Sequence, residues 1–376
     1  MRARDLAIAI GDFPPGPLNA ITDVSGVAVG HSTLISGEGA LRMGSGPVRT
    51  GVTVVMPHER IWDQPVFAGP HRLNGSGELT GLEWIRESGQ LTSPIGLTNT
   101  HSVGVVRDAL VREQVTARGT DELYWCLPVV GETYDGLLND INGHHVTADH
   151  VREALANATT GPVAEGNVGG GTGMMCHEFK GGIGTSSRVL QRADGTAYTV
   201  GVLVQANYGR RSRLRINGIP VGEIIGPDVV PVPEALQMSE PGSGSIIVIV
   251  ATDAPLLPHQ CKRLAQRAGI AIGRMGGTGE QYSGDLFLAF STANRGKLPP
   301  YGCDPVVETS EDEISLRMVP NEALSNLFEM VIDATEESIV NALVAAETMT
   351  GADGATVHAV GHDLLRSAMT ATGGAR

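Results

Sequence analysis

The first feature of this sequence that could do chemistry is a serine at the start of an apolar run, GSGSIIVIVAT, over residues 242–252. Glycine and serine are ordinary turn residues before a strand, so Ser245 could have a purely structural role. The alternative is that the Gly244–Ser245 bond is scissile and that cleavage makes Ser245 a new N-terminus. A free α-amino group has a pKa of about 7.7–8.0, so it can act as a general base toward the hydroxyl beside it.

The sequence lacks other common devices for activating a serine. It contains no G-x-S-x-G elbow, which argues against an α/β-hydrolase, and no histidine stands in a recognisable nucleophile context. Self-cleavage would be an N→O acyl shift in which the Ser245 hydroxyl attacks the Gly244 carbonyl. Glycine at that position puts no side chain in the path of the attack. These residue types therefore favour an N-terminal nucleophile.

Glycine clusters and histidines raise two further possibilities, a nucleotide site and a metal site. The phosphate-loop pattern G-x-x-x-x-G-K-[ST] is absent from both glycine clusters, GNVGGGTGMM (166–175) and GRMGGTGEQYSGD (273–285). His358 and His362 are four residues apart but lack the glutamate of an H-E-x-x-H motif. The sequence therefore predicts no cofactor and no metal, and the glycines are expected to let the backbone approach a reacting group closely.

The elements that must position Ser245 are predicted to be mixed strands and helices. Valine-rich runs predict strands at 26–35 and 51–57, and helical patterns follow at 102–118 and about 257–273. A buried strand is expected at 245–252, another at 285–292, and a long helical region from about 321 to 350. Such an order favours layered α+β or α/β/α packing over a Rossmann sheet.

Turn signals and one linker complete this outline. Asp194-Gly195 and Asn217-Gly218 each lie between alternating runs and predict β-hairpins. The segment 228–244, which is rich in proline and glycine, is predicted to be an exposed connection that ends at Ser245.

Composition excludes several classes of partner. The 376 residues carry a formal net charge of −14, which argues against nucleic acid and anionic membranes, since both attract basic surfaces. The four cysteines are far apart in the chain and are expected to be free thiols rather than a disulfide framework. No secretory signal and no membrane-spanning run is predicted, so a soluble cytoplasmic protein is expected.

Five motifs together closely resemble the DmpA/BapA family of L-aminopeptidase/D-amidase-esterases and β-peptidyl aminopeptidases, which are self-cleaving hydrolases. In chain order they are VVGETYDGLLNDING, GNVGGGTGMMCHEFKGGIGTSSR, VGVLVQANYG, GSIIVIVATDAPLLPHQCKRLA and YSGDLFLAFSTAN. The resemblance runs from about Ile21 to beyond Val340. It implies an α/β (α+β) fold, a layered αββα sandwich like that of N-terminal-nucleophile hydrolases and ornithine acetyltransferase. It also implies a single catalytic domain, 1–376, that cleaves itself into an α chain, 1–244, and a β chain, 245–376.

The resemblance also implies roles for residues near the cleavage site. Gly244 and Ser245 match the residues on either side of the cleaved bond, and Ser245 matches the nucleophile of both self-cleavage and substrate hydrolysis. Ser283 and Asp285, in YSGD, match the Ser-x-acid pair that supports the nucleophile.

Three further residues match the substrate site of the family. Asn207, in VQANYG, matches the asparagine that stabilises the oxyanion. Tyr134, in GETYDG, matches a tyrosine that lines the same site. Glu132 matches the carboxylate that holds the free amino group of the substrate.

The expected function is therefore release of N-terminal amino acids from short peptides, amides or esters through an acyl-enzyme on the N-terminal serine. The family resemblance implies a homo-oligomer of αβ protomers, with a homotetramer expected. Two alternatives stay open. One is an acyltransferase related to ornithine acetyltransferase, although that enzyme uses threonine, and the other is an uncut, non-catalytic member with a binding or structural role.

Overall fold

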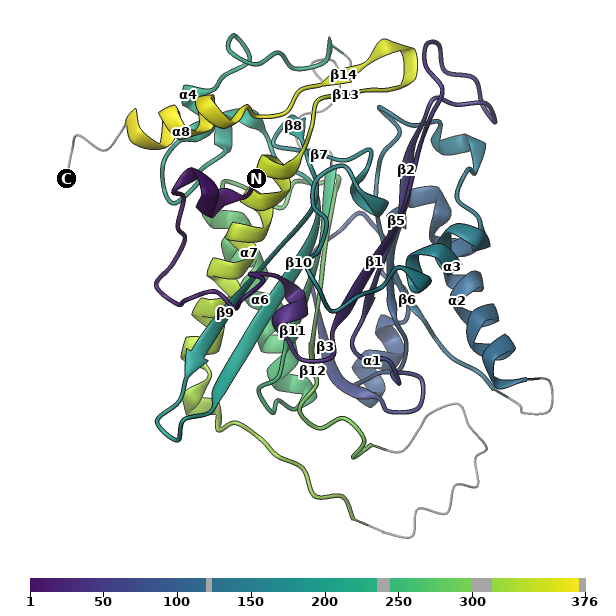
Figure 1. The fold of residues 1–376 in the computed structure, drawn as a ribbon, viewed down its shortest axis with the longest axis vertical. Helices are drawn as coiled ribbons and strands as arrows, with labels where there is room; N and C mark the ends of the chain where they lie inside the picture. The colour runs from purple at the N-terminus through teal and green to yellow at the C-terminus, as the bar shows by residue number, and fades with distance from the viewer. Residues whose placement is uncertain (120–123, 235–243, 299–312, 372–376) are drawn as a thin grey trace.

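Two β-sheets packed face to face, with a pair of helices over each outer face, form the centre of the fold (Figure 1). The computed structural model describes residues 1–119, 124–234, 244–298 and 313–371. The four-stranded sheet has the order β1 (Ala28–Ser36), β2 (Val48–Met56), β5 (Ile95–Asn99), β6 (Val129–Thr133). The six-stranded sheet has the order β4 (Gln90–Leu91), β3 (Val66–Gly75), β12 (Ser283–Ser291), β11 (Gly244–Thr252), β10 (Ala197–Asn207), β9 (Gly182–Gln191).

Two pairs of helices form the outer layers. In Figure 1, α6 (Pro258–Arg274) and α7 (Ser325–Ala345) lie against the six-stranded sheet, and α2 (Val103–Arg118) and α3 (Ala148–Ala156) against the other. The remaining short elements are α1 (Leu82–Ser88), β7 (Met175–Cys176), β8 (Phe179–Lys180), α4 (Val221–Ile224), β13 (Met349–Thr350), β14 (Thr356–Val357) and α8 (His362–Ala371). The predicted αββα sandwich is confirmed.

Strand β11 is apolar on both faces because it lies in the middle of the sandwich. Ile246, Val248 and Val250 belong to the core between the six-stranded sheet and its helices. Ile247 and Ile249 belong to the core between the two sheets. Side chains alternate along a strand, so Ser245 shares the face that looks toward the four-stranded sheet. This doubly buried position explains why SIIVIVAT has no polar alternation.

Most neighbouring strands run antiparallel, but β11 pairs in parallel with β12 and β5 pairs in parallel with β6. The register of β11 places Ser245 opposite Asn207 of β10 on one side and opposite Gly284 of β12 on the other. Three residues from separate motifs thus meet at one end of the sheet.

Several local predictions can be compared with the structure. The Asp194-Gly195 turn does join β9 to β10. A hairpin is also predicted at Asn217-Gly218, but the structure has only the turn there. A single bridge, Ile216 to Ile219, flanks the turn, and no pair of strands extends from it. The predicted helical region 321–350 is shorter, because α7 ends at Ala345. Residues 228–234 of the predicted linker carry no strand, and 235–243 lie outside the described residues.

Candidate active site

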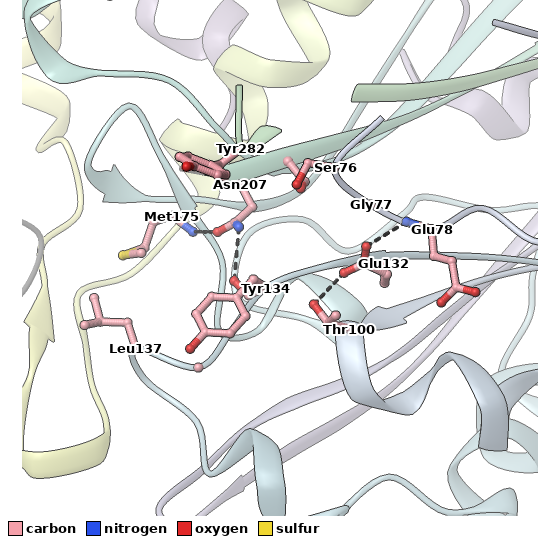
Figure 2. A pocket seen from close by; sticks show the side chains of 13 residues that line it. Ser76, Gly77, Glu78, Thr100, Glu132, Tyr134, Leu137, Met175, Asn207 and Tyr282 are labelled. Carbon is pink, nitrogen blue, oxygen red and sulfur yellow. Dashed lines mark hydrogen bonds between the residues drawn. The ribbon is translucent and has the colours of Figure 1, made fainter. Parts of the chain in front are cut away.

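A cavity of about 640 Å³ opens where β6, β10 and β11 come together (Figure 2). Its walls come from segments far apart in the sequence, including the 76–78 turn, the ends of those strands, and the loop before β12. The lining residues are Ser76, Gly77, Glu78, Thr100, Glu132, Tyr134, Gly136, Leu137, Met175, Asn207, Gly244, Ser245 and Tyr282. Four of the predicted site residues therefore face one cavity, together with the predicted cleavage position Gly244.

Ser245 is buried at the start of β11, with 5% of its surface exposed. The Gly284 backbone N–H donates a hydrogen bond to the Ser245 Oγ over 3.0 Å. That contact fixes the hydroxyl oxygen at the cavity wall and leaves the hydroxyl proton for a base.

Gly244 is packed too tightly to carry a side chain. A Cβ at this position would lie 2.4 Å from the Asn207 carbonyl oxygen and 3.1 Å from the Tyr208 Cα. Both contacts are with backbone atoms, which cannot move aside without disturbing the sheet. Glycine before Ser245 is thus required by the fit of β11 against β10, and it keeps the Gly244 carbonyl free of steric cover.

Ser283 and Asp285 form a buried pair at the start of β12. The Ser283 Oγ donates to the Asp285 Oδ1 over 2.6 Å. Burial, with a smaller contribution from the nearby Glu280 charge, raises the pKa of Asp285 to about 6. Since Ser283 is the β12 partner of Gly244, the pair lies beside the predicted scissile bond.

Asn207 is held in one orientation by two backbone groups (Figure 2). Its Oδ1 accepts from the Met175 N–H over 2.8 Å, and its Nδ2 donates to the Tyr134 carbonyl over 3.0 Å. An N–H can only donate and a carbonyl can only accept, so the amide cannot be flipped. One Nδ2 hydrogen is used by the Tyr134 carbonyl, and because Asn207 lines the cavity the other is available as a donor to an oxyanion.

Glu132 is a buried carboxylate on the same cavity. Its Oε1 accepts from the Glu78 N–H over 2.9 Å and its Oε2 from the Thr100 hydroxyl over 2.5 Å. Burial raises the pKa of Glu132, and the two hydrogen bonds oppose that rise. Within the described part of the chain, no lysine or arginine forms an ion pair with it. A positive group entering the cavity would find an uncompensated negative charge there.

Gly77 connects the Glu132 side of the cavity to the Ser245 side. A Cβ at Gly77 would lie 3.1 Å from both the Glu132 Oε1 and the Gly284 Cα. Gly284 is also the residue whose N–H contacts the Ser245 hydroxyl. Gly77 therefore lies between the Glu132 carboxylate and the Gly284 backbone that contacts the serine.

Tyr134 lines the cavity, but in a less constrained way than its neighbours. Its carbonyl orients Asn207, while the residue is 53% exposed and its ring is one of the side chains that line the cavity (Figure 2). The backbone around it is held by Asp135, which is buried and accepts from the Asn99 and Asn139 amides.

The sequence analysis did not identify Thr100, Met175 or Gly284 as site residues. Thr100 contacts Glu132, the Met175 N–H orients Asn207, and the Gly284 N–H contacts Ser245. Two of these contacts are made by backbone groups, so no residue type could have marked them. The available signal was membership of the quoted motifs: Gly284 is the glycine of YSGD, and Met175 lies in GNVGGGTGMM.

Two further searches cover only the described ranges. Among those residues, no group of three or more His, Cys, Asp and Glu side chains is placed to hold a metal ion. No helix within them is long and apolar enough to cross a membrane.

Comparison with known proteins adds a family to this geometry. Residues 19–357 match peptidase family S58. The sequence is 51% identical over 373 residues to a beta-peptidyl aminopeptidase of Sphingosinicella microcystinivorans, covering 97% of this chain and 91% of that protein.

Solved structures show the same relationship. A beta-aminopeptidase of a Burkholderia species is 55% identical and superposes with a TM-score of 0.89 over 99% of both chains. The L-aminopeptidase D-Ala-esterase/amidase of Ochrobactrum anthropi, described as a prototype of the serine aminopeptidases and a variant of the Ntn-hydrolase fold, is 46% identical, with a TM-score of 0.88 over 99% of both chains. These relatives favour a peptidase over the acyltransferase alternative. The chain therefore belongs to peptidase family S58 and has the Ntn-hydrolase fold of the serine aminopeptidases.

Proposed function

We propose that this chain is a self-processing aminopeptidase whose nucleophile is Ser245. The observation that carries the proposal is that two buried groups line one cavity. The first is a serine that follows a glycine required by the packing, and the second is a carboxylate that has no ion-pair partner among the described residues. The serine supplies a nucleophile, and the carboxylate supplies a binding site for the ammonium group of an unblocked substrate. The relatives' names agree with both halves of this reading.

Self-processing would convert the precursor into two chains. The Ser245 Oγ attacks the Gly244 carbonyl carbon, the C–N bond breaks, and the hydroxyl proton passes to the leaving nitrogen, which leaves an ester. The Ser245 amine is free after this shift. Water then hydrolyses the ester, which releases the Gly244 carboxylate and restores the Ser245 hydroxyl. The buried Ser283–Asp285 pair, next to Gly244 across the parallel ladder, is placed to bind that amine.

Substrate hydrolysis would reuse the same atoms. The Ser245 amine takes the hydroxyl proton, the Oγ attacks the substrate carbonyl, and the leaving amine or alcohol carries the proton away. The second Nδ2 hydrogen of Asn207 stabilises the oxyanion, a contact typically worth about 3 kcal/mol of barrier. Water hydrolyses the acyl-enzyme in a second round of the same chemistry.

The proposed substrates are short peptides, amides or esters with a free N-terminal amino group. The relatives are named as a beta-peptidyl aminopeptidase and an L-aminopeptidase D-Ala-esterase/amidase, and in this chain Glu132 would supply the counter-charge for a terminal ammonium group. Assembly into a homotetramer of αβ protomers and a cytoplasmic location stay predictions of the sequence.

Intact mass and N-terminal sequencing of the purified protein test the proposal. Scaling 39.3 kDa by 244/376 and 132/376 gives fragments of about 25.5 and 13.8 kDa, the smaller one beginning Ser-Ile-Ile-Val. Ser245→Ala is expected to stay at full length and to hydrolyse nothing. A stable, uncut wild type with no aminopeptidase activity would contradict the proposal and favour the non-catalytic alternative.

A further inference from the structure

Lys180 is a buried cation close to the site that the proposed mechanism does not use. It ends β8, and none of its surface is exposed. Its ammonium donates to three backbone carbonyls, those of Met174 at 2.7 Å, Gly181 at 2.9 Å and Gly171 at 3.4 Å. All three belong to the segment 171–181, which contains β7 and the Met175 N–H that contacts Asn207.

Burying this charge is costly, and no carboxylate offsets the cost. Within the described ranges, Lys180 forms no ion pair with an acidic side chain. Burial lowers the pKa of Lys180 to about 7, and the nearby Cys176 opposes that shift. The three carbonyls can only accept hydrogen bonds, so they favour the protonated amine. A neutral donor would satisfy the same carbonyls more cheaply. The Met174 carbonyl in fact already accepts from the Gly181 N–H over 2.9 Å.

The position of Lys180 on one particular peptide group links it to Asn207. The Met174 carbonyl and the Met175 N–H belong to the same peptide. Lys180 is bound to the oxygen of that peptide, and Asn207 Oδ1 is bound to its N–H, at 2.8 Å (Figure 2 shows the second contact). Hydrogen bonds in a chain polarise one another, so a cation on the carbonyl makes the N–H a stronger donor. The Asn207 amide is polarised in the same sense, which makes its free Nδ2 hydrogen a stronger donor to the cavity.

We propose that Lys180 is a positioning residue for the oxyanion site, acting on Asn207 through the Met174–Met175 peptide. This inference rests on the proposed function, because it requires Asn207 to bind an oxyanion. Lys180 does not touch the substrate. Its ammonium orders and polarises the peptide whose N–H holds the Asn207 Oδ1, which is one of the two backbone contacts of that amide. Its contribution therefore belongs to the transition state rather than to substrate binding.

Two substitutions test the role of the charge, with a matched control. Lys180→Met keeps the length of the side chain and removes both charge and donors, whereas Lys180→Gln keeps donors for the carbonyls and carries the test if the first variant does not fold. The control is Arg211→Gln. Arg211 is also a buried cation bound to backbone carbonyls, but it does not contact the Met174 peptide. The carbonyls that it binds are those of His177, Glu178, Ile225 and Val230.

The readouts separate transition-state effects from general damage. For Lys180→Gln, we expect kcat to fall by about tenfold with KM within about twofold, less than the 10²–10³-fold loss typical of removing an oxyanion donor itself. A free-amine α-aminoboronic acid forms a tetrahedral anionic adduct on the serine, so its affinity should fall by the same factor. Affinity for the released amino acid should not change. Arg211→Gln should lower the melting temperature and leave kcat unchanged.

Each contrary result has a distinct meaning. Unchanged kcat and boronate affinity in Lys180→Gln, or equal losses in Lys180→Gln and Arg211→Gln, would overturn the inference while an active wild type still upholds the proposed function. A fall in affinity for the amino acid as large as that for the boronate would also overturn it, because the effect would then be structural. A wild type that neither cleaves itself nor hydrolyses free-amine substrates would overturn the proposed function and this inference together.

Discussion

Replacing Glu132 by glutamine tests whether the buried carboxylate recognises the amino terminus of the substrate. The change preserves shape: the new carbonyl oxygen can still accept from the Glu78 N–H, and the new amide can donate to the Thr100 hydroxyl, where the carboxylate now accepts. Only the negative charge is lost. At 3% exposure, little solvent screening reduces the effect of that loss.

The size of the effect follows from the burial of the pair. Breaking a buried ion pair costs about 3–5 kcal/mol, and each 1.36 kcal/mol is a factor of ten in rate. Since a polar amide stays behind, the lower end applies, so kcat/KM for free-amine substrates should fall about 10²-fold. N-acetylated substrates carry no ammonium group, so the slow hydrolysis of these compounds should not fall further.

Stability should move in the opposite direction from activity. Burial raises the folded-state pKa of Glu132, so the ionised carboxylate opposes folding at every pH above that pKa, and the cost disappears below the unfolded-state value. Glu132→Gln removes the cost at neutral pH, so the melting temperature of the free protein should stay the same or rise.

The assay compares kcat/KM on an amino-acid p-nitroanilide with that on its N-acetyl derivative, alongside a thermal melt. Glu78→Gln is the matched control, because it removes an exposed carboxylate from the rim of the same cavity and keeps the backbone N–H that contacts Glu132. It should change kcat/KM only a few-fold. Equal losses on both substrates, or a lower melting temperature with the lost activity, would refute the assignment of Glu132 as the ammonium site.

Three further predictions concern other residues. Asp285→Asn should flatten the fall in unfolding free energy between about pH 4 and pH 6. Because the pKa of Asp285 is raised to about 6, the native state binds this proton more tightly than the unfolded state does, which is worth up to about 3 kcal/mol of unfolding free energy at low pH. If the urea midpoints of variant and wild type depended on pH in the same way, the prediction would be wrong. Asn207→Ala should lower kcat about 10²–10³-fold with little change in KM, measured on mature protein, and a change confined to KM would argue against the oxyanion role. Gly184→Ala should destabilise the fold by about 1–3 kcal/mol or more, because its Cβ would lie 1.9 Å from the Ser338 carbonyl. Gly104→Ala, with open space around it, should be neutral or stabilising. The urea unfolding midpoints of both variants test this, and an unchanged midpoint for Gly184→Ala would mean that α7 can shift away from β9.

Local sequence predicted much of the secondary structure because the signals involved are short-range. The Asp194-Gly195 turn and the apolar run after Ser245 each depend on a few adjacent residues, and both elements are present. Asn217-Gly218 has the same local signal and the positive φ angles of such a turn, yet only one bridge flanks it. The difference is tertiary: Gly222 packs directly on the Arg211 backbone, so the chain after the turn enters α4 instead of a strand.

The motif resemblance named the site residues, but their contacts were not readable from the sequence. Ser245, Asn207 and Gly284 meet because β11 has one particular register between β10 and β12, and a shift by one residue would turn Ser245 away from the four-stranded sheet. Register is set by packing over the whole length of the strands, which no short stretch contains.

The sequence by itself determined the serine after a glycine, the order of the five motifs and the mixture of strands and helices, because these are properties of neighbouring residues. Tertiary structure alone decided that Glu132 is buried without an ion-pair partner in the described ranges, that the Met175 N–H fixes Asn207, and that Lys180 lies on the same peptide. The burial of Glu132 depends on how packing excludes water from the cavity wall. The contacts of Asn207 and Lys180 are made to backbone groups, which every residue has. Side-chain identity alone does not encode either of them.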